Sequence, residues 1–147
     1  MFSKREKRAI EYFGGIEEFL SLCASYKTYL NNRPFSEHTR IDFDCTGVNG
    51  LCVVNQMCVY EGEKCLDLII KDSRYCVRLD DKSLEYLVCI KKNLAEFNEN
   101  LSEDYLDSFE FIKGRPFYVR IVNGIVVSIG LADIKMFSDN LTILDKL

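Results

Sequence analysis

Three aspartates could together hold a divalent metal ion. Asp42 and Asp44 are two residues apart in a stretch that alternates apolar and polar residues, so on a strand they would project from one face, roughly 7 Å apart. A third carboxylate from a neighbouring strand, such as Asp67, would complete a set of oxygen ligands suited to Mg²⁺ or Mn²⁺. The simpler interpretation, which we favour, is that Asp42 and Asp44 form the polar face of an edge strand, where charge discourages aggregation.

Seven cysteines also invite metal or nucleophile chemistry, but their spacing does not support it. No two have the short separation that places a pair on one tetrahedral zinc ion. His38, the single histidine, is the only candidate base for a Cys-His pair, and it lies in a polar linker where a solvated side chain is the ordinary outcome. We therefore expect no cofactor and predict reduced thiols that pack mainly as small buried hydrophobes.

An acidic block lies between Lys92 and Lys113, where the sequence has six acids and no base. If helix persists through 96–110, most of these acids lie on adjoining turns, and like charges at that spacing destabilise a helix. This indicates a partner or a surface constraint, although a solvated face is the simpler alternative. We predict that the block binds a basic surface of another protein, such as a groove that normally holds nucleic acid. Its members are Glu96, Glu99, Glu103, Asp104, Asp107 and Glu110.

A basic cluster at the start of the chain offers a nucleic-acid alternative. Lys4, Arg5, Lys7 and Arg8 fall at the beginning of a predicted helix, where the helix dipole also favours phosphate. Four cations in such a position are commonly just solvated, and the acidic block would repel a nearby nucleic acid. We therefore place nucleic acid behind protein as the partner.

The leading prediction is a small protein-binding module, an inhibitor or adaptor, and the alternative is a divalent-metal-dependent enzyme that uses Asp42, Asp44 and Asp67. The sequence has no phosphate-binding glycine loop, no zinc-protease motif and no serine-nucleophile motif. Its net charge of −4 does not dictate a partner, and its oligomeric state is left open. Because no apolar run could span a bilayer and acids interrupt the only candidate signal peptide, we expect a soluble, cytoplasmic protein without a membrane partner.

The strongest signal for local structure is Asn123-Gly124 between two β-branched runs, which predicts a hairpin over 117–130 with a type I′ turn. Folding the chain about this turn places Val122 opposite Ile125 and Arg120 opposite Val127. Both faces of the hairpin are then mostly apolar, so we expect it inside a sheet.

The remaining segments predict one α+β domain over 1–147. Ser3 and Glu6 form a capping box that starts a helical region over 3–30. Short turns then separate strands over 41–79, which predicts an antiparallel meander with a bulge or turn at Asn55-Gln56. A further helical region follows over 81–112, and 131–147 forms short packed elements. The expected sheet has about six mainly antiparallel strands, packed by the N-terminal and central helices.

Overall fold

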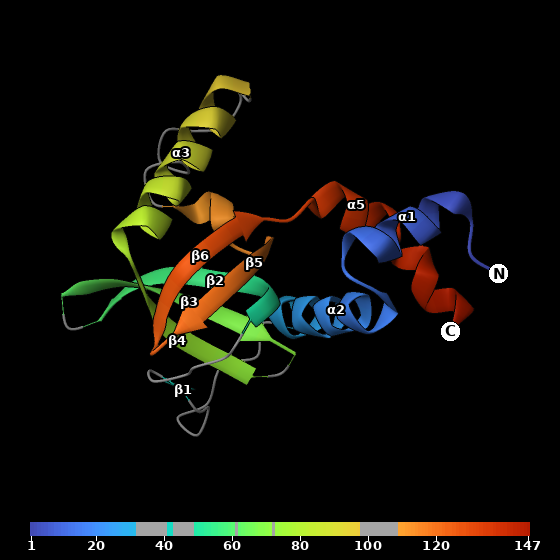
Figure 1. Cartoon of the computed structure of the whole chain (residues 1–147), viewed down its shortest axis with the longest axis horizontal. Helices are drawn as coiled ribbons and strands as arrows, with labels where there is room; N and C mark the ends of the chain where they lie inside the picture. Colours follow the sequence, from blue (N-terminus) through green and yellow to red (C-terminus); the bar gives the residue numbers. More distant parts are fainter. Residues whose placement is uncertain (32–40, 43–48, 61, 72, 98–108) are drawn as a thin grey trace.

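The computed structural model describes residues 1–31, 41–42, 49–60, 62–71, 73–97 and 109–147, and it is α+β as predicted (Figure 1). The helical elements are α1 (Lys4–Tyr12), α2 (Ile16–Leu30), α3 (Asp81–Phe97), α5 (Ile134–Asp139) and the 3₁₀ helices η1 (Glu110–Ile112) and η2 (Leu141–Lys146). The strands are β1 (Ile41–Asp42), β2 (Asn49–Tyr60), β3 (Glu63–Ile70), β4 (Ser73–Leu79), β5 (Pro116–Val122) and β6 (Ile125–Leu131).

The five longer strands close into a barrel. They are hydrogen-bonded in the order β4-β3-β2-β5-β6 through antiparallel pairs, and β4 then pairs with β6 in parallel to complete the ring. The expectation of about six mainly antiparallel strands therefore agrees in outline, but the sheet is mixed.

The predicted place of the 41–42 strand at the start of an antiparallel meander is wrong. Strand β1 pairs in parallel with β4, and Ile41 lies opposite Arg74. The reason lies in β2, whose two sides are already taken by β3 and β5. Strand β1 therefore joins the sheet at β4 instead.

The Asn123-Gly124 turn forms as predicted, with φ angles of 52° and 74°. Val122 lies opposite Ile125, also as predicted. The predicted register is wrong by one residue from Arg120 onward, since Arg120 pairs with Ser128 rather than with Val127. Val127 is the extra residue of a β-bulge, a local feature that the alternation of residue types does not reveal. A second register shift lies between Val54 and Gln56 of β2, where the sequence predicted a bulge or a turn.

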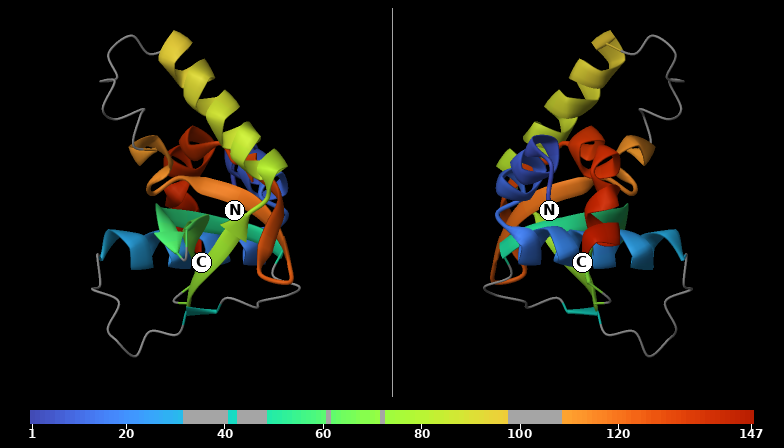
Figure 2. Two further views of the ribbon diagram at one scale, coloured as in Figure 1. Left: turned by 90° about the vertical axis from the view of Figure 1, so that its left-hand side faces the viewer. Right: turned by 90° about the vertical axis from the view of Figure 1, so that its right-hand side faces the viewer.

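Two apolar clusters cover opposite faces of the sheet. Alternate residues of β2 show the division, because Cys52 and Val54 belong to one cluster while Leu51 and Val53 belong to the other. The first cluster includes Leu87 of α3 and is also built from β3, β4, β5, β6 and η1. The second joins the other face to α1, α2, α5 and η2. Helix α3 projects beyond the sheet, away from these N- and C-terminal helices (Figures 1 and 2).

Candidate functional site: a basic groove between α1 and α5

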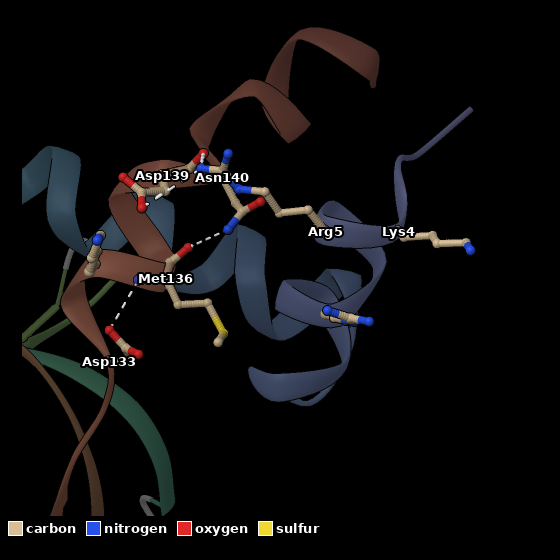
Figure 3. Close-up of a pocket in the computed structure, with 8 residues that line it drawn as sticks. Lys4, Arg5, Asp133, Met136, Asp139 and Asn140 are labelled. Atoms are coloured by element: carbon tan, nitrogen blue, oxygen red, sulfur yellow. Dashed lines mark hydrogen bonds and ion pairs between the residues drawn. The ribbon is translucent and has the colours of Figure 1, made fainter.

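A groove of about 580 Å³ lies between α1 and α5 (Figure 3). Most of its lining is charged, and the cationic side chains come from both helices. Met136 contributes apolar surface and Asn140 contributes a side-chain amide. The full lining is Lys4, Arg5, Arg8, Asp133, Lys135, Met136, Asp139 and Asn140.

Local capping fixes where each helix of the groove begins. The Ser3 hydroxyl accepts a hydrogen bond from the Glu6 amide at 3.1 Å, and the Glu6 carboxylate accepts one from the Ser3 amide at 2.9 Å. This predicted capping box places the cations of α1 in its first two turns. The Asp133 carboxylate caps α5 with a single bond, accepting a hydrogen bond from the Met136 amide at 3.1 Å.

Phe137 anchors α5 to the rest of the molecule. It is 2% exposed, and its ring lies 6.1 Å from Phe13, 5.7 Å from Phe19 and 5.5 Å from Tyr26, measured between ring centroids. Aromatic rings packed edge-on or tilted at such separations stabilise the fold by more than the burial of their apolar surface alone. This cluster holds the helices on both sides of the groove in one apolar core.

The charge of the groove is not balanced. Arg5 donates a hydrogen bond to the backbone carbonyl of Asp139 at 3.0 Å, and its guanidinium lies 3.7 Å from the Asp139 carboxylate. Lys4, Arg8 and Lys135 have no ion-pair partner among the residues that the structure describes. Four cations and two carboxylates therefore line the groove, and this excess of positive charge suits an anionic ligand.

Asn140 adds a polar group that is not satisfied internally. The residue is 3% exposed, and its side-chain nitrogen donates to the Met136 carbonyl at 2.7 Å. Its side-chain oxygen is the one buried side-chain polar atom in the described part of the chain that lacks a hydrogen-bond partner. An unsatisfied buried acceptor costs about 1–3 kcal/mol, so this oxygen needs an explanation.

Glu6 joins α1 to the C-terminal 3₁₀ helix. Its carboxylate accepts hydrogen bonds from the Lys146 ammonium and, at 3.3 Å, from the Thr142 hydroxyl. The bond from Lys146, followed by that from the Ser3 amide, lowers the pKa of Glu6 from 4.5 to about 2. The ionised form of Glu6 therefore favours the folded state.

This shift predicts that the effect of Lys146→Met on stability depends on pH. Because the pKa of Glu6 is lowered on folding, its stabilisation is fully present above pH 4.5 and is lost as the pH falls through about 2. We expect the loss of unfolding free energy in Lys146→Met to be constant near neutral pH and to shrink over this acidic interval. Urea unfolding of the wild-type protein and of Lys146→Met, from neutral pH down to about pH 2, measures this loss. A loss that stays constant down to pH 2, or an equal pH dependence for the control Lys135→Met, would contradict the assignment.

The metal hypothesis remains a prediction. Asp44 lies outside the described residues, as does His38, and Asp42 is described only through its strand pairing with Tyr75. Asp67 is fully buried, and both of its oxygens accept hydrogen bonds from other side chains. Within the described ranges, no group of three His, Cys, Asp or Glu side chains is arranged to hold a metal ion.

The acidic block is not tested by the structure. Glu99, Glu103, Asp104 and Asp107 lie outside the described residues. The backbone of Glu96 belongs to α3 and that of Glu110 to η1, but α3 ends at Phe97, so a helix continuous through 96–110 is not part of what is described. The block therefore stays a prediction.

The described thiols include buried, half-buried and exposed examples. Cys52, Cys65 and Cys76 are buried and Cys89 is exposed, while Cys45 lies outside the described residues. Burial raises the pKa of Cys52 to about 12, which disfavours the reactive thiolate.

Sequence reasoning identified the cations of α1 but missed the other side of the groove. Lys135, Met136 and Asn140 lie in the 131–147 region, which was predicted only as short packed elements. Asp133 was the available signal, because aspartate is a preferred residue immediately before a helix.

Comparisons with known proteins identify no relative: no protein-family model, no curated protein and no solved structure matches this chain. Among the described helices, none combines the length and the apolar character needed to cross a bilayer.

Proposed function

We propose that this chain is a protein-binding module and that the α1–α5 groove binds an acidic segment of the partner. The observation that carries this proposal is that cations from both helices line one groove, and that Lys4, Arg8 and Lys135 among them have no ion-pair partner in the described structure. Acidic side chains would supply the missing charge, and charge complementarity would speed their association with the groove.

An acidic protein segment suits the molecule better than a nucleic acid does. The chain has a net charge of −4 and a pI near 5.1, whereas nucleic-acid-binding domains typically carry a basic stripe and a high pI. A nucleic acid longer than the groove would meet the negative field of the remaining surface. Nucleic-acid binding through the N-terminal helix is kept as an outcome of the test.

The acidic block over 96–110 is proposed as a second contact, directed at a basic surface of the partner. Its support is the sequence pattern of six acids without a compensating base. A partner that met both the groove and the block would need one acidic and one basic region.

The test is a charge-reversal experiment on the groove. The triple variant Lys4→Glu, Arg8→Glu, Lys135→Glu should lower affinity for a labelled peptide of alternating Glu and Gly by about tenfold or more, because like charges then face the peptide. Fluorescence anisotropy at low and physiological salt measures the affinity of each protein for the peptide. Binding by the triple variant should also depend less on salt than binding by the wild-type protein.

Three exposed lysines away from the groove provide a matched control. The variant Lys27→Glu, Lys82→Glu, Lys92→Glu changes the net charge by the same amount and should bind the peptide much more tightly than the groove variant. Equal losses in the two variants would show that only net charge matters and would overturn the proposal. Tighter binding of a single-stranded oligothymidine than of the peptide would favour the nucleic-acid alternative.

A second charge reversal tests the acidic block. Once a partner protein is in hand, Glu99→Lys, Glu103→Lys, Asp107→Lys should slow its association if the block is a contact. An unchanged association rate would remove the block from the interface and leave the groove.

A further inference from the structure

We propose that Asn140 makes the groove selective for an extended peptide backbone, by accepting a hydrogen bond from a backbone N–H of the bound segment. This inference rests on the proposed function, since it concerns the same groove. It adds a feature by which a peptide backbone differs from a phosphodiester backbone of similar charge.

The orientation of the Asn140 amide is fixed by its neighbour on α5. Its nitrogen must face the Met136 carbonyl, because only the nitrogen can donate to that oxygen. The side-chain oxygen consequently turns away from Met136, and Figure 3 shows it on the side of Asn140 that faces α1. The unpartnered acceptor is therefore directed into the space between the two helices of the groove.

Arg5 is the cationic side chain that a hydrogen bond holds beside Asn140. It donates to the carbonyl of the Asp139–Asn140 peptide group, so its guanidinium lies beside Asn140. The Arg5 side chain is 67% exposed, and its charge partner Asp139 is 42% exposed at 3.7 Å, so solvent screens their attraction. A carboxylate arriving in the groove competes with Asp139 for Arg5.

The chemistry of the site selects the ligand class. The groove offers cations for negative charge and one acceptor that requires a donor. An extended acidic peptide supplies both, because every residue carries a backbone N–H and each acidic residue adds a carboxylate. A phosphodiester backbone supplies the negative charge, but its phosphate oxygens are acceptors only.

The decisive experiment compares the Glu-Gly peptide with its counterpart in which every backbone nitrogen is methylated. Methylation removes the donors and keeps the charges. We expect wild-type protein to bind the methylated peptide about tenfold more weakly, and Asn140→Ala to bind both peptides with the same low affinity. Ser138→Ala, an exposed neighbour on α5 outside the groove lining, should retain the wild-type preference.

The outcomes separate this inference from the proposed function. If wild-type protein binds neither peptide, the proposed function fails. If it binds both peptides equally and the groove charge reversal weakens binding, the function stands and the role of Asn140 is wrong. Should Asn140→Ala fail to fold, equal binding of the two peptides by wild-type protein would still overturn the inference, because that comparison needs no variant.

Discussion

Arg74→Met should lower the free energy of unfolding by about 3–5 kcal/mol, because it leaves the buried Asp67 carboxylate without its cation. The Asp67 side chain is fully buried, and Arg74 contacts both of its oxygens, at 2.8 Å through Nε and at 2.7 Å through the terminal nitrogen. The amides of Asn55 and Gln56 donate further bonds to Asp67, at 3.1 and 3.3 Å. Such a pair contributes little when intact but is costly to break from one side.

A second ion pair between neighbouring strands is the matched control. Arg78 of β4 lies 2.8 Å from Glu63 of β3, but both side chains are about half exposed. Arg78→Met should therefore cost no more than about 1 kcal/mol. Adding Asp67→Asn to Arg74→Met should recover part of the loss, since it removes the unpaired charge. Urea unfolding measures all of these variants, and equal costs for the two arginines would show that burial of Asp67 does not set the effect.

Phe137→Ala should have an effect of similar size, about 3–5 kcal/mol, because it removes the ring on which Phe13, Phe19 and Tyr26 converge. For a domain of this length, the melting temperature should fall by roughly 10 °C. Thermal unfolding followed by circular dichroism measures the change. Leu144→Ala on η2, where the side chain is 42% exposed, should cost much less. If the two substitutions cost the same, the aromatic cluster is not what holds α5 in place.

Features of the fold that depend on residues adjacent in the sequence could be predicted from the sequence. The capping box at Ser3 and Glu6 and the turn at Asn123-Gly124 are determined within four residues, and both form as predicted. The helix predicted to run to about Leu30 ends there for the same reason, since helical periodicity is also local.

Features that depend on distant segments could not be predicted. The parallel pairing of β4 with β6 joins residues nearly fifty positions apart, and no local pattern marks it. The groove could not be predicted for the same reason, because Arg5 and Asp139 come into contact although almost the whole chain separates them in sequence. The basic cluster was visible in the sequence, but the residues that turn it into a groove become its neighbours only after folding.

Closure of the barrel limits how another molecule can add to the sheet. Strand edges are common sites of aggregation and of strand addition by a bound peptide, because their backbone donors and acceptors are unpaired. Where β4 meets β6, these groups are used internally: the amide of Arg78 donates to the Gly124 carbonyl at 3.0 Å and that of Asp80 to the Val126 carbonyl at 3.3 Å. Along this seam neither strand can template an intermolecular sheet, so the closure protects the molecule there against edge-to-edge aggregation.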